Sequence, residues 1–573
     1  MKQLDRATPH ARLSHQRASI TVRRSGASHV PRTDADRALD VQDVGDVKIY
    51  QMSAIAERAT AEWRAKLHSL RQQLHRPFGA SARAEPVRVP VSAQCFTRDC
   101  AKLLQSGIVS LVSEDEERRR PSLGRCKAFS VVERNRGAGK PDRRRWILHP
   151  EEQNDAAYAS GFVSCVDLHH VSAYLGDVYH EVGCVSDISA SFYGLELPLA
   201  SRAFYRFRDE HGTLYEMNRG MMGHTLMADI QHIITNIVAG HPAYVQPRFA
   251  APCVTRVWID NINFVGSRER VAVARDRLAA TCSDAQCHVA MDVGSPAQQY
   301  TFIGVDFDHA ARTTCLAAKT RRKLPATLPD AMPAEELEQL VSRLIFAAAV
   351  RQEPLANHWW ALKWSRRFFN KINRGQLHPH ALVPICGSAR TSLAHWLETA
   401  ATPHVVNRAF TGRRATLFTD ATLHGWGAVL ISDDGRIVVV GGRFEGGQRA
   451  GDIGRKEAWA VVNALRALRD PMRGVSDLDL FVDNTSVEAA LRRGVPRADS
   501  LVEPVAAAWR DVIGSRISLF VDYVSTKVNP SDAASRGQRV ALEAVQHAMR
   551  HTTNNNTTRE MAVANKFVSA AGP

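Results

Sequence analysis

Four acidic residues in the last third of this 573-residue chain stand in settings that favour chemistry. They are Asp420, Glu457, Asp483 and Asp532. Three follow strand-like or loop-like runs, and Glu457 opens a helix. If a fold gathers such carboxylates, they can hold two divalent metal ions, which stabilise both the attacking and the leaving oxygen of a phosphodiester. The set therefore predicts two-metal chemistry on nucleic acid.

The elements that must position these acids follow in a regular order. Strands are predicted over residues 415–418, 425–431, 436–441, 478–482 and 517–523. Asp433-Asp434-Gly435 reads as a hairpin turn. Glu457 begins a helix whose apolar residues recur at helical spacing, and Ser500 with Glu503 has the spacing of a capping box for a helix through Ile513.

This order of elements and acids resembles the RNase H family across residues 413–537. The resemblance implies that all four acids bind two Mg²⁺ ions, which activate water against the RNA strand of an RNA–DNA hybrid. For any single Asp, the alternative is a strand-end cap or a turn residue. The loop before the last acid, where the family often has a His, reads Tyr-Val-Ser-Thr-Lys over residues 523–527.

A second set of candidate residues lies upstream. A predicted strand from Val182 leads into Asp187, and Phe192 follows five residues later. Residues 255–265 read as a hairpin with Asp260-Asn261 at its tip. Between them, residues 217–224 open an apolar helix through Val238 that stops at Gly240 before a Pro, and residues 300–304 form a strand ending in Gly.

This ordered set resembles the palm of reverse transcriptases across about residues 100–310. The resemblance implies that Asp187 and Asp260 bind the two Mg²⁺ ions that bring a primer 3′-hydroxyl in line with a dNTP, with Mn²⁺ as an alternative metal. Phe192 matches the aromatic residue that excludes a ribose 2′-hydroxyl. Asn261 stands where most members have a second acid, so it modifies the metal site without adding charge.

Further residues match the nucleotide pocket of the same family. Arg219 and Gly220 correspond to the turn that floors the pocket. Residues 140–154 resemble the basic fingers strand, in which Arg145, with Arg143 nearby, best fits a contact to the triphosphate, since a guanidinium can fork onto phosphate oxygens. A solvated basic loop is the alternative for that run.

The composition describes an ordinary globular protein with a polyanionic partner. The chain is 45% hydrophobic and 23% charged, with a net charge of +15, which favours nucleic acid without excluding other polyanions. Its scattered cysteines suggest reduced thiols, and it has no secretory signal or membrane span. We therefore expect an intracellular protein of the nucleus or cytoplasm, not bound to membrane.

We expect an α/β and α+β multidomain chain. The expected order is a basic, largely disordered arm (1–90), reverse transcriptase fingers and palm (91–325), a helical thumb or connection (326–412), an RNase H-like α/β domain (413–537) and a polar tail (538–573). The arm could alternatively be a transit peptide, and it contains a candidate amphipathic helix over residues 54–74.

A palm followed by RNase H in one basic chain resembles a retroelement replication protein. Short segments, together with the absence of protease-like and integrase-like motifs, are similar to DIRS-like and VIPER-like elements, and a gypsy-type polyprotein fragment is the near alternative. The resemblance implies an RNA template, a DNA primer, dNTPs and RNA–DNA hybrid as partners, and a separately encoded tyrosine recombinase. A degenerate copy that binds hybrid without polymerising, or acts only as a nuclease, stays open. The sequence leaves the oligomeric state unknown.

Overall fold

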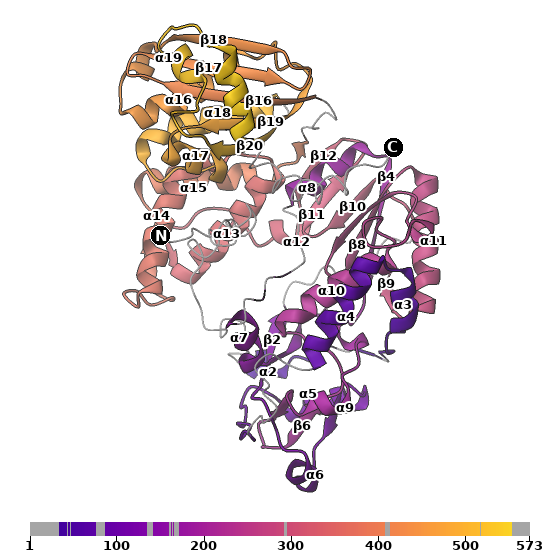
Figure 1. Cartoon of the computed structure of the whole chain (residues 1–573). Coiled ribbons are helices and arrows are strands. Elements are labelled where there is room, and N and C mark those ends of the chain that lie inside the picture. The colour runs from indigo at the N-terminus through magenta and orange to yellow at the C-terminus, as the bar shows by residue number, and fades with distance from the viewer. Residues whose placement is uncertain are drawn as a thin grey trace. The chain divides into compact units, whose positions relative to one another are not determined.

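The computed structural model describes residues 34–42, 44–45, 47–75, 86–133, 141–159, 162, 164, 171–290, 295–406, 413–515 and 517–552. The chain is a mixed α/β protein of more than one domain (Figure 1). Its described residues form two compact units, which we name the upstream unit (34–164 and 180–310) and the downstream unit (171–179 and 311–552). The basic run before Arg32 and the polar run after Thr552 lie outside the described residues.

The upstream unit is built on a four-stranded sheet of order β7-β8-β4-β9. β4 (Val182–Ile188) pairs antiparallel with β8 (Asn261–Gly266), which forms a hairpin with β7 (Val254–Trp258), and β9 (Val289–Ala290) lies on the other side of β4. Helices α10 (Thr225–Val238) and α11 (Arg268–Asp284) pack with this sheet around one apolar core. The predicted palm hairpin and the helix ending before Gly240 are both present.

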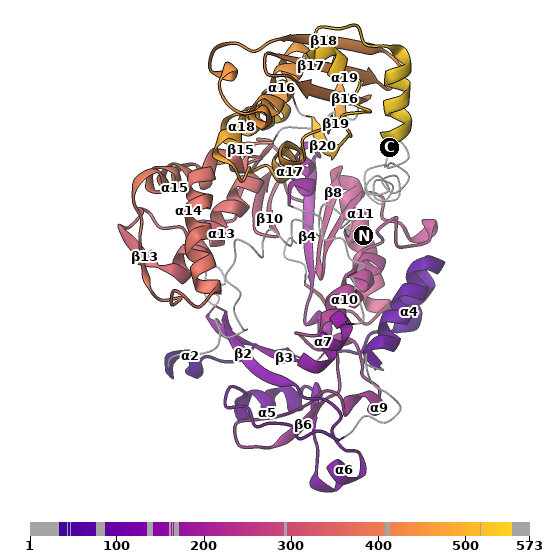
Figure 2. The ribbon, with the colours of Figure 1, turned by 60° about the vertical axis from the view of Figure 1, so that its left-hand side comes forward.

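Residues 47–75 differ from the expected largely disordered arm. They form α3 (Met52–Arg58) and α4 (Ala61–His75), and both helices pack against α10 (Figure 2). Leu67, Leu70 and Leu74 are buried at helical spacing. The single helix expected over residues 54–74 is interrupted because Ala59 is extended and the Thr60 amide donates to the Tyr244 carbonyl.

The remaining strands of the upstream unit form small separate sheets. β2 (Lys127–Glu133) pairs with β3 (Arg143–His149), and β1 (Val109–Leu111), β6 (Leu214–Met217) and β5 (Arg206–Arg208) form a three-stranded sheet. The predicted strand at residues 300–304 is one arm of a hairpin between β10 (Gln299–Phe302) and β11 (Val305–Asp308). Its turn has positive φ at Ile303 and Gly304, as a two-residue hairpin loop requires.

The downstream unit begins with a helical part. α13 (Ala334–Val350), α14 (Trp359–Asn373) and α15 (Gly387–Ala400) pack on one another, and the short strands β13 (Ala331–Pro333) and β14 (Leu382–Pro384) pair beside them. The unit boundary lies at residue 310, whereas the sequence pattern placed the end of the palm at residue 325.

A five-stranded sheet forms the rest of the downstream unit, in the order β18-β17-β16-β19-β20 (Figure 1). Its elements along the chain are β16 (Arg413–Ala421), β17 (Gly425–Ser432), β18 (Ile437–Arg443), α16 (Ile453–Ala467), β19 (Val475–Val482), α17 (Thr485–Arg493), α18 (Val502–Gly514), β20 (Ser518–Tyr523) and α19 (Ser531–Ser535). The first three strands are antiparallel, and β16, β19 and β20 run parallel.

Alternate residues of the central strands face two different apolar cores, as the pleat of a strand requires. Leu417 and Leu480 join the core that α16 and α18 cover. Phe418 and Phe481 stack on the opposite face, with ring centroids 5.1 Å apart. The sheet is therefore buried on both sides.

Two details differ from the expectations. Residues 542–552 are helical, and Val545 and Ala548 are buried against Phe418 and Phe481, so the segment after 537 is not polar tail throughout. The Ser500–Glu503 capping box is also wrong, because α18 begins after Leu501 without a side-chain cap and Glu503 pairs with Arg455 instead.

Among the helices that the structure describes, none is both long and apolar enough to cross a membrane.

Candidate functional site: two groups of carboxylates

Three of the four predicted nuclease acids converge at one end of the five-stranded sheet. Thr419 of β16 is paired with Val482 of β19, so the next residues along these parallel strands, Asp420 and Asp483, lie side by side. Glu457 reaches them from the second turn of α16. One carboxylate oxygen from each of the three lies within 4.8 Å of the others.

The charge of this cluster is not balanced by the protein. Burial raises the pKa of Glu457 to about 9, and the negative charges of Asp483 and Asp420 add to the shift. Burial, together with the charges of Asp483 and Asp532, likewise raises the pKa of Asp420 to about 7, against a lowering hydrogen bond from Ser535. Among the described residues, Glu457 Oε2 is a buried oxygen without a hydrogen-bond partner. Crowded carboxylates with an unsatisfied oxygen are a donor set that fits a divalent cation.

The fourth acid, Asp532, is held by the short helix α19. Arg536 pairs with its carboxylate, with 2.8 Å between Arg536 Nη2 and Asp532 Oδ1. The single hydroxyl proton of Ser535 is shared between the Asp420 carboxylate and the Asp532 backbone carbonyl, which lies 2.9 Å from Oγ. One hydroxyl thus connects the two acids, and the charge of Asp532 acts on both Asp420 and Glu457.

Buried Asn529 fixes the loop that delivers Asp532. Its Nδ2 donates to the Thr419 carbonyl at 2.9 Å, and its Oδ1 accepts from the Ser531 amide at 3.2 Å. Sequence reasoning missed the roles of Asn529 and Ser535. The sequence around them suggested a motif but no partner for either side chain. Their hydrogen bonds to β16 join residues more than a hundred positions apart in the chain.

Glycines on β17 and β18 allow α19 to approach the sheet. A Cβ atom on Gly427 would lie 2.2 Å from the Ser535 nitrogen, and one on Gly425 would lie 2.8 Å from the Ser535 carbonyl oxygen. Because no Cβ fits in that space, the Gly-Trp-Gly-Ala run beginning at Gly425 has a packing explanation. A groove of about 570 Å³ lies alongside, lined in part by His424, Arg443 and Arg536.

In the upstream unit, the predicted polymerase acids lie close together, Asp187 on β4 and Asp260 in the turn between β7 and β8. Asp187 of β4 is directly opposite Asn261 of β8, and the Ile188 amide donates to the Asp260 carbonyl at 3.0 Å. Asp260 sits in the tight turn after Ile259, whose φ is +60°. The structure therefore brings Asp187, Asp260 and Asn261 together at one end of the hairpin.

The Asp260 carboxylate is already partnered. Asn261 Nδ2 donates to Asp260 Oδ1 at 2.8 Å, and Ser191 Oγ donates to Asp260 Oδ2 at 3.3 Å. Burial raises the pKa of Asp260, while the hydrogen bonds and the positive charge of Arg145 act in the opposite direction. Asn261 thus contributes an amide donor to the acid beside it, where a second carboxylate would contribute charge.

The predicted nucleotide-pocket residues also meet. Phe192 lies in the 3₁₀ turn η2 (Ser191–Gly194), and a Cβ on Gly220 would lie 2.5 Å from the Phe192 carbonyl oxygen. The backbone of Arg219 forms an isolated antiparallel β-bridge with that of Glu196, which follows η2. The Gly220 amide donates to the Leu195 carbonyl at 2.7 Å, which holds this turn against η2.

β3, which the sequence suggested as a basic fingers strand, divides its arginines between two faces. Arg144 is buried and pairs with Asp99, with 2.7 Å between Nη2 and Oδ1. On the other face, Arg143 and Arg145 share the carboxylate of Glu133, at 2.7 Å and 3.0 Å. The expected run of basic residues is therefore a strand with one structural arginine and two arginines that share one acid.

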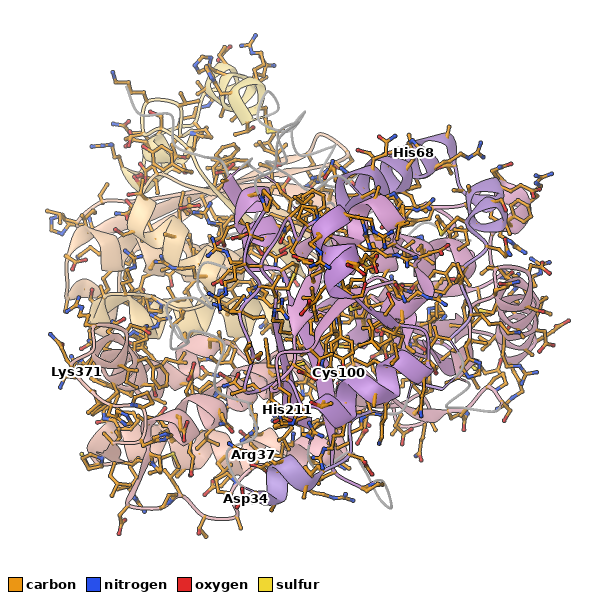
Figure 3. The ribbon with its side chains drawn as sticks, turned by 90° about the horizontal axis from the view of Figure 1, so that it is seen from below. Asp34, Arg37, His68, Cys100, His211 and Lys371 are labelled. Carbon is orange, nitrogen blue, oxygen red and sulfur yellow. The ribbon has the colours of Figure 1, made fainter. Side chains whose placement is uncertain are left out.

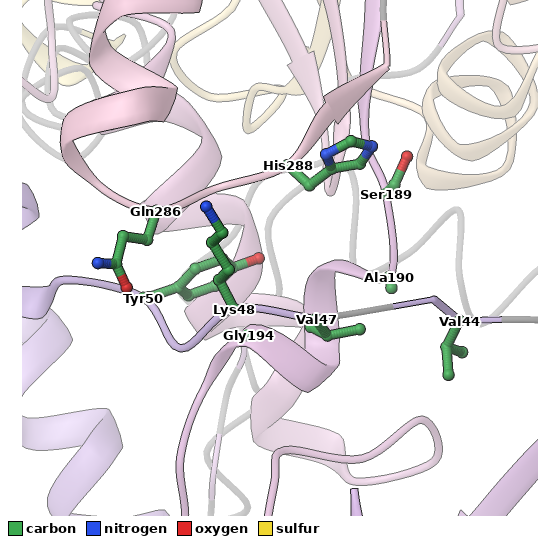
Figure 4. A pocket seen from close by; sticks show the side chains of 9 residues that line it. All are labelled: Val44, Val47, Lys48, Tyr50, Ser189, Ala190, Gly194, Gln286 and His288. Atoms are coloured by element: carbon green, nitrogen blue, oxygen red, sulfur yellow. The ribbon is translucent and has the colours of Figure 1, made fainter. Parts of the chain in front are cut away.

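Residues that precede the expected palm support the turn next to Asp260. Tyr50 Oη donates to the Ser191 carbonyl at 2.6 Å, and burial raises its pKa well above the usual value. A small pocket of about 30 Å³ lies beside the end of β4, the strand that carries Asp187 (Figure 4). Its lining includes Lys48, Tyr50, Ser189 and His288. Sequence reasoning missed these contacts because it treated residues 1–90 as a largely disordered arm.

No protein-family model matches this sequence, and no curated protein matches it either. Three similar solved structures are complexes of foamy viral protease-reverse transcriptase. The complex of the dRH form with double-stranded DNA has a TM-score of 0.45, 12% identity and coverage of 84% of this chain and 83% of that chain. The second complex with double-stranded DNA has a TM-score of 0.43 and 13% identity, and the match covers 84% of this chain and 99% of that chain. The complex with RNA/DNA hybrid has a TM-score of 0.41 and 13% identity, and the match covers 84% of this chain and 64% of that chain. Similarities at this level decide neither fold nor function, so the conclusions below depend on the geometry of the two sites.

Proposed function

We propose that the chain is a retroelement RNA-directed DNA polymerase with RNase H activity, which copies element RNA into DNA and degrades the RNA of the hybrid. The observation that carries the proposal is the carboxylate cluster of Asp420, Glu457 and Asp483 at the end of the β18-β17-β16-β19-β20 sheet. Its partners are an RNA template, a DNA primer, RNA–DNA hybrid and dNTPs.

The nuclease half rests on the electrostatics of the cluster. Carboxylates with pKa values raised to about 7 and 9 favour a divalent cation, since the cation removes their mutual repulsion. Asp420, Glu457, Asp483 and Asp532 would hold Mg²⁺ or Mn²⁺, which supplies an activated water and stabilises charge on the phosphodiester. Ser535 and Arg536 orient Asp420 and Asp532 for that task.

The polymerase half rests on Asp187 and Asp260 lying close together, with Asp260 hydrogen-bonded to Ser191 of the η2 turn, which contains Phe192 and against which Gly220 packs. A dNTP would lie with its sugar near Phe192 and its triphosphate near Arg145 or Arg143. The two carboxylates would hold the metals that activate the primer hydroxyl and the triphosphate. The net charge of +15 supports a polyanionic partner.

Primer extension on a defined RNA template tests this proposal. We expect template-dependent DNA synthesis in Mg²⁺ or Mn²⁺, and we expect Asp187→Ala to abolish it. An absence of extension in both metals, with hybrid binding intact, would refute the polymerase half.

Asn261 supports a second candidate function, a reverse transcriptase-like protein that binds hybrid and cleaves RNA without polymerising. The amide of Asn261 occupies Asp260 Oδ1, so the upstream site has less negative charge than two adjacent acids would provide. In that case, Asp420→Asn abolishes cleavage and no variant affects extension, because there is none.

The element class is part of the same proposal. The Gly-Trp-Gly-Ala run that begins at Gly425 and the Ala-Ala-Ser-Arg run that follows Asp532 favour DIRS-like or VIPER-like elements, which would supply a separately encoded tyrosine recombinase. Co-purification of this chain with such a recombinase from cells that carry both genes would test that assignment. Recovery of the chain as part of a protease- or integrase-containing polyprotein would contradict it.

A further inference from the structure

A group of arginine side chains meets where α14 contacts the loop after α17, within the downstream unit. Trp359, Lys363 and Arg366 recur at i, i+4 and i+7 and so lie on one face of α14. The Trp359 indole Nε1 donates to the Pro496 carbonyl at 3.0 Å. This bond turns the same face of α14 toward the end of α17, where Arg493 and Arg497 lie.

These guanidinium groups are close enough to repel one another. Burial lowers the pKa of Arg366, and the charges of Arg493 and Arg497 add to that effect. Burial and the charge of Arg497 lower the pKa of Arg493 in the same way. Arg366 Nε is a buried nitrogen with no hydrogen-bond partner among the described residues.

Neighbouring arginines show how the fold treats a charge that has only a structural role. Arg492 pairs with Glu488, with 2.6 Å between Nη1 and Oε1, and Arg455 pairs with Glu503 at 2.9 Å. In the part of the chain that the structure describes, no ion pair holds Arg366, Arg493 or Arg497, and the charge of Glu488, which already pairs with Arg492, is the smallest influence on Arg493. A partly buried, unneutralised group of like charges costs stability, which a polyanionic ligand would offset.

We propose that Arg366, Arg493 and Arg497 form a binding site for the sugar–phosphate backbone of a nucleic-acid duplex. A guanidinium binds phosphate oxygens through two parallel hydrogen bonds, and backbone contacts position a duplex without reading its sequence. Lys363, whose Nζ lies 3.9 Å from the Trp359 ring centroid, extends the basic surface on this face of α14, whereas exposed Lys371 (Figure 3) lies on a different face of the helix.

The inference rests on the proposed function and adds a second anchor for its substrate. α17 starts two residues after Asp483 and is 9 residues long, which corresponds to roughly 14 Å of helix. A duplex engaged at the carboxylates would reach the arginines about four base pairs farther along its axis. The site would hold hybrid and double-stranded DNA alike.

The test is the salt dependence of hybrid binding by the full chain, measured by fluorescence anisotropy in EDTA so that no cleavage occurs. For the triple variant Arg366→Gln, Arg493→Gln, Arg497→Gln, we expect affinity to fall at least about tenfold. The slope of log K against log salt should shrink by about 0.9 for each phosphate that the variant no longer neutralises. Arg492→Gln is the matched control, and its slope should stay that of the unmodified chain.

Thermal unfolding separates a binding role from a structural one. If the triple variant unfolds at the same or a higher temperature and binds hybrid more weakly, the result supports the site. The variant has then lost the repulsion between the arginines together with their contacts to the nucleic acid. An unchanged slope and affinity, or a preference of the unmodified chain for anionic vesicles over hybrid, would overturn it. If the triple variant does not fold, exposed Arg497→Gln alone should still reduce the slope, by about 0.9.

Failure of this site is distinguishable from failure of the proposed function. Asp420→Asn should lose cleavage and keep the salt slope, whereas the triple variant should lose slope while both carboxylate groups remain. If the unmodified chain binds hybrid with a steep slope but neither extends nor cleaves, the arginine site stands and the proposed function falls.

Discussion

The two carboxylate groups of this chain differ in how the fold treats negative charge. In the downstream unit, three acids lie within 4.8 Å of one another and a fourth acts on them from α19. In the upstream unit, Asp187 lies on β4 opposite Asn261, Asp260 lies in the adjoining turn, and Asn261 donates a hydrogen bond to Asp260. The downstream group therefore depends strongly on a cation for its ionised state, and the upstream group satisfies part of its charge internally.

This difference teaches how to interpret a raised pKa at such a site. Burial raises the pKa of both Asp260 and Glu457, but like charges add to the shift only at Glu457. A bound metal ion relieves the repulsion between carboxylates, but it does not relieve the cost of burial alone. The comparison predicts strong coupling between metal and stability downstream and weaker coupling upstream.

The largest expected effect is that of Glu457→Gln on the downstream group. Cleavage of hybrid should fall roughly 10²- to 10³-fold, the range seen when one preorganised electrostatic interaction with a transition state is removed. Without metal, the same variant should be more stable by about 1–2 kcal/mol, because Gln can be buried at neutral pH without taking up a proton, as a Glu with so raised a pKa must. Cleavage rates and thermal unfolding in EDTA measure both. A variant that cleaves normally would remove Glu457 from the site.

The pH dependence of stability should separate the two units next. Glu457 and Asp420 have folded-state pKa values of about 9 and 7, above their ordinary values of 4.5 and 3.8. Both favour the protonated form when folded. Their contribution to stability is therefore complete below about pH 4 and is lost as the pH rises toward 9.

Mg²⁺, if the ionised carboxylates hold it, should reverse that loss. Unfolding temperatures from pH 5 to pH 9, in EDTA and in Mg²⁺, check this, with Glu457→Gln as the control that flattens the EDTA curve. Identical curves with and without metal would contradict the account.

Packing of α19 should have a smaller but clear effect. Gly427→Ala places a Cβ 2.2 Å from the Ser535 nitrogen, so α19 must move and Asp532 and Ser535 with it. We expect a loss of about 1–3 kcal/mol and slower cleavage, with primer extension unaffected. Gly447→Ala is the matched control, since its added Cβ has no atom within 4 Å. Equal stability of the two variants would show that the close approach has no role.

The smallest expected effect is that of Asn261→Asp. A second carboxylate beside Asp260 would replace an amide donor with charge, which makes the upstream group resemble the downstream one. We expect the Mg²⁺ concentration for half-maximal extension to fall about tenfold, equivalent to about 1.4 kcal/mol. A metal titration of primer extension measures this. An unchanged requirement would mean that position 261 does not tune the metals.

Much of the architecture could be predicted from local patterns. Short apolar runs bounded by turn residues defined β16, β17 and β19, which are buried on both faces, and helical spacing after Glu457 defined α16. That these acids meet was expected from the resemblance stated for residues 413–537, and the parallel pairing of β16 with β19 is what brings Asp420 and Asp483 together. The hairpin with Asp260 at its tip and the helix ending before Gly240 also follow from turn and stop signals.

The rest depends on contacts between distant residues. Ser535, Asn529 and Tyr50 support the acids through hydrogen bonds that span more than a hundred residues, and no local pattern encodes such partners. Glu503 had the spacing of a cap, but Arg455 on another helix attracts it instead. Residues 47–75 and 542–552 have modest helical patterns and become ordered because the α10 helix and the five-stranded sheet offer apolar faces to cover.

The central claim is that the two carboxylate groups are separate active sites with different reactions. One assay tests it most directly: extension of a labelled DNA primer on a labelled RNA template, with both strands followed together, for Asp187→Asn and Asp420→Asn. Asp187→Asn should stop extension and leave RNA cleavage of preformed hybrid intact, and Asp420→Asn should do the reverse. Normal extension by Asp187→Asn, or normal cleavage by Asp420→Asn, would contradict the account.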